Sequence, residues 1–429
     1  MTAGGGPLGI LAGDGGLPLE VADEVRRSGR PVHIVAIAGA AEPGIEAHPH
    51  TWVDLGQIGG MLRAFREAGC QDLVILGGVR RPNLLKLRPD LGFFRNLPVI
   101  LSLMAGGDDS VLRRVVSFFE RHGFRVVGAH NVAPALVAEE GVLGGAEPKD
   151  HLLPDIALGF ALIEELAPLD VGQAVVMANG RPIAIEGAEG TDRMLARVRE
   201  MRAAGLGEHG GGVIVKAPKR GQELRVDMPA IGPRTVEGAV AAGLEGIAIA
   251  AGQVLVAERS RVREALHRTG LFLVAANPEA QWSAAPQRSQ GETKPGRLRW
   301  VSGKVKWRDI RDAERAIQAI STVRPFGAGE AAVVARQHVL AIEAGEGAER
   351  MLERVAGLRQ WGDRSSRRRR GVVAFRAANA NAKNCTQWAA NSGLAGVVLA
   401  GPWPDGDRSE FAMAAARAGL FVLTCEDHG

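Results

Sequence analysis

The chain contains one segment twice. Residues 184–195 read AIEGAEGTDRML, and residues 341–352 read AIEAGEGAERML. Three further blocks recur in the same order: DIALGFALIEEL at 155 and DIRDAERAIQAI at 309, AAGLEGIAIAAG at 241 and NSGLAGVVLAG at 391, RTGLFLVAA at 268 and RAGLFVLTC at 417. Collinear matches of this kind are the signature of an internal repeat. The sequence therefore predicts that one domain is present in two copies.

The repeated stretch predicts a hairpin followed by a helix. In AVVMANGRPIAIE, from residue 174, two apolar runs flank Asn179-Gly180, a pair typical of tight hairpin turns. The matching stretch from residue 332, AVVARQHVLAIE, is one residue shorter, so we expect a shorter turn there. The segment TDRMLARVREMRAAG then predicts a helix, and GGVIVKAPK predicts a strand.

The first 130 or so residues alternate short apolar strands with amphipathic helices. Leu8–Ala12 is followed by a glycine turn and by a helix that ends at Gly29. Strands at 31–39, 72–78 and 125–129 then alternate with helices at 59–70 and 109–124. This rhythm is typical of a doubly wound, Rossmann-like parallel sheet.

We therefore expect an α/β chain of four parts. We expect residues 1–132 to form a Rossmann-like domain, for which the motifs below suggest nucleotide binding, and residues 133–277 to form an α/β domain, for which they suggest catalysis. Residues 278–298 are polar, rich in Pro, Ser and Gln, and lack periodicity, which indicates a linker. Residues 299–429 are a degenerate copy of the catalytic domain.

Composition favours a protein of the cytoplasm. The chain has 429 residues, of which 46% are hydrophobic and 23% charged, and no apolar run reaches the ~18 residues of a membrane span. The start lacks the basic region of a signal peptide, and the three cysteines form no CxxC pair. The one dense basic run, Arg367–Arg370, fits a solvated loop or a contact with anionic lipid head groups. No nucleic-acid-binding motif accompanies it, so we expect no nucleic acid partner.

The first glycine loop is a candidate for nucleotide binding. It follows a strand and opens a helix, which is the context of a phosphate cradle, although an ordinary tight turn would look the same. Pro18 in place of a third glycine, and the lack of an acidic residue after the second strand, disfavour a dinucleotide. Asp14 would repel a phosphate, so a nucleoside or sugar contact is favoured. The candidate contacts are Gly13, Gly15, Gly16, Leu17, Pro18, Gly78 and Asp109; Asp109 also fits a helix N-cap.

The second domain holds residues suited to metal and phosphate. Glu186, Glu189 and Asp192 lie within seven residues around a turn, which suits Mg²⁺, although Thr191 or Asp192 could simply cap the helix. Lys216 and Lys219 follow a strand and could hold a phosphate as point charges.

A third group of candidates follows the lysines. In GQELRVDMPAIGP, Arg225 and Asp227 are two residues apart, so on a strand they would project to the same face. Arg225 could then hold a phosphate while Asp227 binds a metal or orients water. Lysines, arginine and carboxylates in one domain indicate metal-assisted phosphoryl chemistry.

These motifs resemble those of the LpxI-type UDP-2,3-diacylglucosamine pyrophosphatases of Gram-negative bacteria. The resemblance covers residues 7–277 and is most specific in the pattern GQ-L-R-V-D-x-P-x-I-G-P-x-T. The blocks that carry it are GILAGDGGLPLEVADEVRRSG, DLGQIGGMLRAFREAGCQDLVILGGVRRP, LDVGQAVV, EGAEGTDRMLARV, VKAPKRGQELRVDMPAIGPRTVEGAVAAGLEGIAI and GLFLVA.

The resemblance implies an enzyme of lipid A biosynthesis. Such an enzyme hydrolyses UDP-2,3-diacylglucosamine to UMP and 2,3-diacylglucosamine 1-phosphate (lipid X) with Mg²⁺ or another divalent cation. It works in the cytoplasm, peripherally at the inner face of the inner membrane. A non-catalytic protein of the same fold that binds a UDP-sugar lipid or acts in regulation is the alternative.

The resemblance also implies roles for individual residues. The first domain would hold the uridine, and Asp227 would be the essential residue. Lys216, Lys219 and Arg225 would neutralise the phosphates, and Gln173, Thr191 and Gln222 would contact the substrate. The metal ligands would be Asp227, Asp192 and Glu189.

The second copy lacks the residues that carry this chemistry. It has no R-V-D-x-P block, and VVAFRAANA replaces VIVKAPK, so both lysines are lost. We expect a catalytically dead domain. It could take the place of a partner's C-terminal domain and form an internal pseudo-dimer, although an ordinary homodimer is also possible.

Overall fold

The computed structural model describes residues 6–78, 88–97, 108–206, 210–278, 297–358, 369–402 and 407–425. By its internal contacts the chain forms two compact units. The first comprises Met1–Glu139, Gly221–Pro233 and Ala251–Ala265, and the second comprises Glu140–Arg220, Arg234–Ala250 and Leu266–Gly429. Most of the predicted linker, and Arg367 with Arg368, lie outside the described residues. The four-part division remains an interpretation of the sequence.

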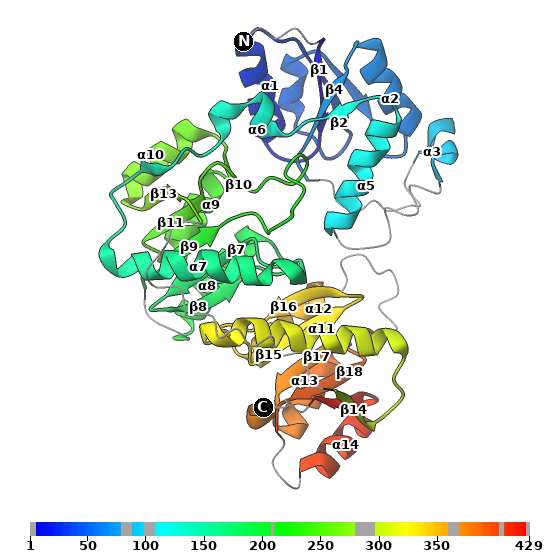
Figure 1. Ribbon diagram of the computed structural model, residues 1–429, viewed down its shortest axis with the longest axis vertical. Coiled ribbons are helices and arrows are strands. Elements are labelled where there is room, and N and C mark those ends of the chain that lie inside the picture. The colour runs from blue at the N-terminus through cyan, green and yellow to red at the C-terminus, as the bar shows by residue number, and fades with distance from the viewer. Residues whose placement is uncertain are drawn as a thin grey trace. The chain divides into compact units, whose positions relative to one another are not determined.

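The first unit contains a five-stranded, fully parallel sheet in the order β3-β2-β1-β4-β5 (Figure 1). Its strands are β1 Leu8–Ala12, β2 Val32–Ile37, β3 His50–Val53, β4 Asp72–Leu76 and β5 Arg125–Val126. This confirms the predicted parallel sheet. Strand β3 was not predicted, because only Val53 of its four residues is fully buried and the segment carries no apolar run.

Helices cover both faces of this sheet. Helices α1 (Leu17–Arg27) and α6 (Ala129–Val132) share one core with Leu8 and Ile10. Helices α2 (Ile58–Glu67) and α5 (Asp108–Arg121) share the other core with Leu11 and Val35. Successive strand residues point to opposite faces, so a run buried on both sides must be continuously apolar, as β1 is. The remaining helical pieces of this unit are η1 Pro43–Ala47, α3 Leu91–Arg95 and η3 Pro134–Leu136.

The second unit contains two six-stranded sheets of identical topology. Their orders are β6-β13-β11-β9-β7-β8 and β14-β19-β18-β17-β15-β16. The first consists of β6 Gly141–Gly144, β7 Ala174–Ala178, β8 Arg181–Ile185, β9 Val213–Lys216, β11 Gly246–Ala250 and β13 Phe272–Ala276. The second consists of β14 Leu298–Ser302, β15 Ala331–Ala335, β16 His338–Ile342, β17 Val372–Arg376, β18 Gly396–Ala400 and β19 Phe421–Cys425. The shared order confirms that the domain is duplicated.

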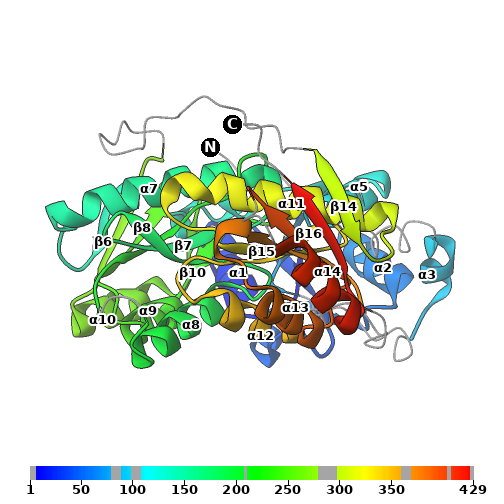
Figure 2. The same ribbon diagram turned by 90° about the horizontal axis from the view of Figure 1, so that it is seen from below.

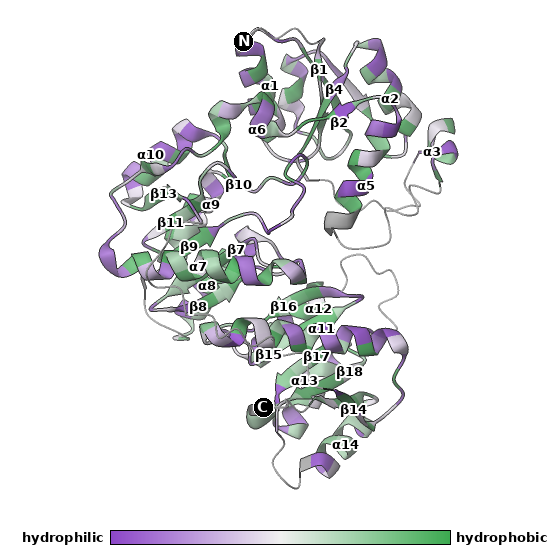
Figure 3. Ribbon diagram, viewed as in Figure 1, coloured by the Kyte–Doolittle hydropathy of each residue, from purple (hydrophilic) through white to green (hydrophobic). Residues whose placement is uncertain are grey.

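The helices follow the same correspondence. The first copy has α7 Leu153–Leu166, α8 Thr191–Ala203, α9 Pro233–Ala241 and α10 Arg259–Thr269. The second copy has α11 Trp307–Val323, α12 Ala348–Leu358, α13 Ala382–Asn391 and α14 Asp407–Ala418. Helices α7 and α11 lie side by side (Figure 2). Both sheets are coloured as mainly hydrophobic, whereas α11 carries hydrophilic residues along its length (Figure 3). Among the described residues, no helix is both long enough and apolar enough to span a membrane.

The two hairpins have turns of equal length. Ala178 pairs with Arg181 and Ala335 with His338, so each turn has two residues, and both ladders shift register at the same place. The expectation of a shorter turn in the second copy was wrong, because β15 begins at Ala331 rather than at the next residue. The turn residues Arg336 and Gln337 have φ of 54° and 67°, and Asn179 has φ of 50°. These left-handed conformations are those that a two-residue hairpin turn requires.

A buried aspartate holds each turn. The Gly180 amide donates to Asp155 Oδ1 at 2.7 Å, and the Gln337 amide donates to Asp312 Oδ1 at 2.7 Å. Asp155 therefore corresponds to Asp312, and the predicted match with residue 309 was wrong by three residues. The error has a physical reason: a shift of about one helical turn preserves an amphipathic pattern. Asp309 instead accepts a hydrogen bond from the Lys306 amide at the start of α11.

Candidate functional site

Two glycine-containing loops of the first unit, at Gly13–Gly16 after β1 and at Gly77–Gly78 after β4, meet where the strand order of the sheet reverses. Strands β1 and β4 are neighbours, while their continuations lie on opposite sides of the sheet, which is where ligands bind in such folds. The Asp14 amide donates to the Gly78 carbonyl at 2.8 Å. A Cβ on Gly13 would lie 2.6 Å from the Gly78 carbonyl oxygen. Gly13 is therefore required for close backbone packing between the two loops.

Gly15 and Gly16 face open space. A Cβ on either would meet no atom within 4 Å, and Gly15 has φ of 92°. Helix α1 begins at Leu17, with Pro18 in its first turn and no side-chain cap at Gly16. Gly15 and Gly16 thus leave room for a ligand beside this loop. Helix α5 begins at Asp108, so Asp109 lies in its first turn rather than at the cap, and its side chain lies outside the described part of the structure.

The segment that carries Asp227 belongs to the first unit and is a turn. The amides of Val226 and Asp227 both donate to the Glu223 carbonyl, at 3.1 and 3.0 Å. The expectation that Arg225 and Asp227 project from one face of a strand was therefore wrong. Val226 packs against the core beside α2 and α5, whereas Met228 packs against the core beside α1 and α6. Asp227, between them, lies where the chain passes from one face of the sheet to the other.

Gln222 orients the carboxylate of Asp227. The buried Gln222 side chain donates through Nε2 to Asp227 Oδ2 and to the Asp227 carbonyl, each at 2.6 Å. Because Gln222 contacts both the carbonyl and the Oδ2 of Asp227, the carboxylate has a defined direction relative to its backbone. This geometry suits a group that orients water or binds a cation.

Arg225 is held by two glutamates. It donates to both oxygens of Glu223, at 2.8 and 2.7 Å, and to Glu120 of α5 at 2.9 Å. The paired guanidinium holds the pKa of Glu223 below its usual range, and the glutamates raise the pKa of Arg225. Because two carboxylates already neutralise its charge, Arg225 is better suited to fixing this turn against α5 than to holding a phosphate.

The second unit contains a buried relay around Lys216. Lys216 ends strand β9, is 8% exposed, and donates through Nζ to Thr191 Oγ1 at 3.0 Å. The Thr191 hydroxyl in turn donates to Glu186 Oε2 at 3.2 Å. Burial raises the pKa of Glu186, and the positive charge of Lys216 opposes that rise. Helix α8 has Gly190 at its N-cap, with no side-chain cap, so Thr191 does not serve as the predicted cap.

Lys219 forms the second buried cation of this region. It is 9% exposed and forms an ion pair with Asp170. The Ala217 amide, between the two lysines, donates to the Gln173 carbonyl at 3.1 Å. Gln173 therefore contributes at least its backbone to holding the segment that carries both lysines. Two lysines with buried ammonium groups and nearby counter-charges can bind an anionic phosphate.

Of the predicted metal ligands in the second unit, Glu189 is buried against two arginines and Asp192 is exposed. Glu189 is 5% exposed and accepts from Arg197 at 2.8 Å and from Arg354 at 3.1 Å. Asp192 is exposed in the first turn of α8. Across the described ranges, no three His, Cys, Asp or Glu side chains lie close enough to hold a metal ion. Glu189 does not fit the role of a metal ligand, because two arginines already occupy its carboxylate. In both copies an arginine follows this glutamate by eight residues, and this repeated spacing is the sequence feature that could have predicted an ion pair in place of a metal ligand.

The second copy keeps the fold without these groups. Phe375 pairs with Ala331 as Lys216 pairs with Ala174, so a phenylalanine occupies the place of the lysine. Ala348 replaces Thr191 at the helix start. Residues 377–381 connect β17 to α13, where 217–232 connect β9 to α9, so the second copy has no counterpart of the Gln222–Asp227 turn.

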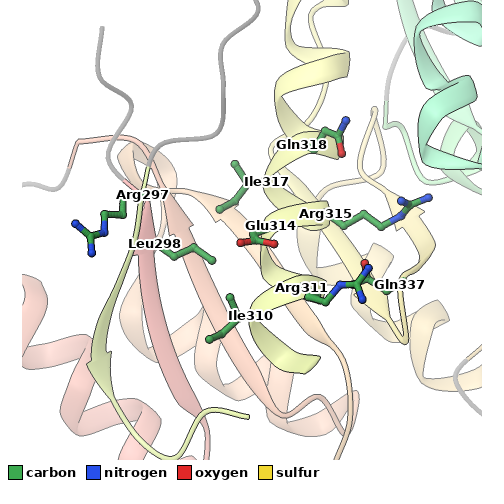
Figure 4. Close-up of a pocket in the computed structure, with 9 residues that line it drawn as sticks. All are labelled: Arg297, Leu298, Ile310, Arg311, Glu314, Arg315, Ile317, Gln318 and Gln337. Carbon is green, nitrogen blue, oxygen red and sulfur yellow. The ribbon is translucent and has the colours of Figure 1, made fainter. Parts of the chain in front are cut away.

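The second copy has a cavity of its own. It has a volume of about 500 Å³ between β14 and α11 (Figure 4). Its lining residues are Arg297, Leu298, Ile310, Arg311, Glu314, Arg315, Ile317, Gln318 and Gln337. None of these corresponds to a candidate site residue of the first copy, and we assign the cavity no ligand.

The fold and these side chains define an α/β protein with a buried lysine–carboxylate centre in one of two copies of a domain. The LpxI N-terminal domain family matches residues 7–136, and the LpxI C-terminal domain family matches twice, at 139–274 and 299–383. The UDP-2,3-diacylglucosamine pyrophosphatase LpxI of Caulobacter vibrioides is 38% identical over 274 residues, which cover 63% of this chain and 98% of that relative. The chain belongs to the LpxI family and carries a second copy of its C-terminal domain.

The raised pKa of Glu186 predicts a dependence of stability on pH. The folded chain holds a proton on Glu186 that the unfolded chain releases near its ordinary pKa of 4.5, so stability falls as the pH rises above 4.5 through the folded value. In Glu186→Gln this contribution is absent. Urea unfolding across this pH range will therefore give a flatter profile for Glu186→Gln than for the wild type, whereas exposed Glu200→Gln keeps the wild-type profile. Identical profiles for all three proteins would contradict the assignment.

Proposed function

We propose that this protein hydrolyses the pyrophosphate bond of UDP-2,3-diacylglucosamine to UMP and 2,3-diacylglucosamine 1-phosphate in lipid A biosynthesis. The observation that carries the proposal is the match to 98% of a relative named as that pyrophosphatase. The chain also carries Lys216, Lys219 and Asp227, the residues to which this chemistry is proposed to belong. A non-catalytic UDP-sugar-lipid-binding protein is not favoured, since that relative is named as an enzyme.

The buried lysines are proposed to stabilise the charge on the phosphates. Water attack on a pyrophosphate moves negative charge toward the leaving UMP, and fixed cations in a water-poor site stabilise that charge most effectively. Lys216 is positioned by Thr191 and Glu186, and Lys219 by Asp170. These partners hold both ammonium groups in place before the substrate binds, which reduces the cost of ordering them in the transition state.

Asp227 is proposed to orient the attacking water. Gln222 holds one of its carboxylate oxygens, so the side chain has a fixed direction. Only Arg220 and Gly221 separate Lys219 from Gln222 in the chain. Gly15, Gly16, Leu17, Pro18 and Gly78 are proposed to contact the uridine end.

The dependence on Mg²⁺ or another divalent cation is a proposal that rests on the family resemblance. Glu189 is not among the proposed ligands, because Arg197 and Arg354 already pair with its carboxylate. Asp227 and the exposed Asp192 remain the proposed ligands, and no step of the reaction is assigned to the ion.

A cytoplasmic location at the inner face of the inner membrane is also proposed. The two acyl chains of the substrate support it, because such a lipid resides in a bilayer. The basic run at Arg367–Arg370 is a candidate for contact with anionic head groups. Of this run, Arg369 is exposed and donates to the Ala418 carbonyl.

The catalytic role of Asp227 predicts the outcome of a direct assay. The wild-type protein will release UMP from UDP-2,3-diacylglucosamine, and Asp227→Ala will lower kcat by at least about 100-fold, because the water loses its orienting group. The exposed carboxylate Glu237 on α9 gives a matched control, and Glu237→Ala will keep the wild-type rate. UMP release that is unaffected by Asp227→Ala would contradict the assignment.

Chelation tests the proposed cation separately. EDTA will abolish UMP release, and added MgCl₂ will restore it. The natural control is EDTA already saturated with Mg²⁺, which will leave the rate unchanged. Hydrolysis that continues at full rate in EDTA would refute the need for a divalent cation while leaving the hydrolysis itself intact.

A further inference from the structure

The two copies meet across a buried cluster of four charged side chains. Arg197 donates to Glu189 at 2.8 Å and to Glu346 at 3.3 Å. Arg354 donates to Glu346 at 2.7 Å and to Glu189 at 3.1 Å. Each glutamate thus accepts from the arginine eight residues later in its own copy and from the equivalent arginine of the other copy. The cluster therefore has approximate twofold symmetry within one chain.

A backbone contact accompanies the charges. The Ala188 amide of the first copy donates to the Leu340 carbonyl of β16 at 3.2 Å. A Cβ on Gly187 would lie 2.5 Å from that same carbonyl oxygen, so glycine is needed for the two backbones to approach. In the second copy, Gly345 corresponds to Ala188, and a Cβ on it would lie 3.0 Å from the Ile183 carbonyl oxygen.

These contacts fall on the loop that carries the Lys216 relay. The loop begins at Glu186 and ends at Thr191, and both side chains take part in the relay. Between them, the second copy holds Ala188 through Leu340 and Glu189 through Arg354. A loop of six residues held at its centre has little freedom to move its ends.

The buried charges make the contact between the second copy and the 186–191 loop difficult to lose. Glu189 and Glu346 are 5% and 2% exposed, so each carboxylate needs its counter-charges within the protein. Removal of one member of a buried ionic group leaves another charge uncompensated. Without Arg354, two buried carboxylates would share Arg197 alone, and the loop around Glu189 would have to rearrange.

We propose that the second copy is a positioning domain, in which Arg354 and the Leu340 carbonyl fix the 186–191 loop and thereby the contact between Thr191 and Lys216. The pattern of retention supports this: the second copy lacks the counterparts of Thr191 and Lys216 but keeps Glu346 and Arg354. The inference rests on the proposed function for its effect on activity, whereas the effect on the loop does not depend on it.

The test compares full-length variants of α12. Arg354→Met will lower kcat for UMP release by at least about tenfold, because a misplaced catalytic group costs that much or more. Hydrogen exchange will become faster at the amides of 186–191 and will stay unchanged in β9 and β17, which separates local loosening from unfolding. The matched control is Arg350→Met, one helical turn earlier; Arg350 is exposed and lines the same groove of about 640 Å³ between α8 and α12.

Two further variants keep the proposal decidable if Arg354→Met fails to fold. Arg354→Lys will lose less activity than Arg354→Met, because it keeps the charge while one ammonium group replaces a guanidinium that bridges two glutamates. Gly187→Ala will loosen the same loop without any change of charge. The positioning role would be overturned if Gly187→Ala and either Arg354 variant showed faster hydrogen exchange at 186–191 but kept the wild-type kcat. Unchanged hydrogen exchange in these variants would show that the second copy does not hold the loop. If the wild type releases no UMP, the proposed hydrolysis fails, and loop exchange still decides whether the second copy holds the loop.

Discussion

The structure of the second unit depends on the buried carboxylate of Glu189. Arg197 from its own copy and Arg354 from the other both donate to it, so one side chain joins two domains. The same six-residue loop carries Glu186 and Thr191, which position Lys216. A buried charge must be compensated locally, so Glu189 requires both arginines. The packing of the two copies and the arrangement of the candidate site therefore depend on the same ion pairs.

The two copies share the residues that the fold requires and differ in those proposed for the chemistry. Asp155 and Asp312 hold equivalent hairpin turns, and both sheets have the same strand order, so these features belong to the fold. By contrast, the connection after the β9 equivalent is short in the second copy, and Phe375 stands in place of Lys216. The second copy thus has the residues that pack the domain and lacks the lysine that is proposed to contact a phosphate.

Sequence reasoning could recover the local features and the repeat but not the long-range contacts. The Asn179-Gly180 turn and the strand before Lys216 follow from patterns of a few residues. The helix register between the copies did not follow, because a shift of one turn preserves amphipathicity. That Asp227 packs with the first unit, and that Glu189 pairs with Arg354, depend on residues distant in the chain, for which no local pattern exists.

The central claim is that the first copy carries the chemistry while the second positions it. UMP release from UDP-2,3-diacylglucosamine by full-length Lys216→Met tests the first part most directly, with exposed Lys383→Met of the second copy as the control. The account predicts a loss of at least about 100-fold in kcat for Lys216→Met and none for Lys383→Met, because Lys216, unlike Lys383, is proposed to stabilise the charge on the phosphates. A folded Lys216→Met protein that works at the wild-type rate would contradict it.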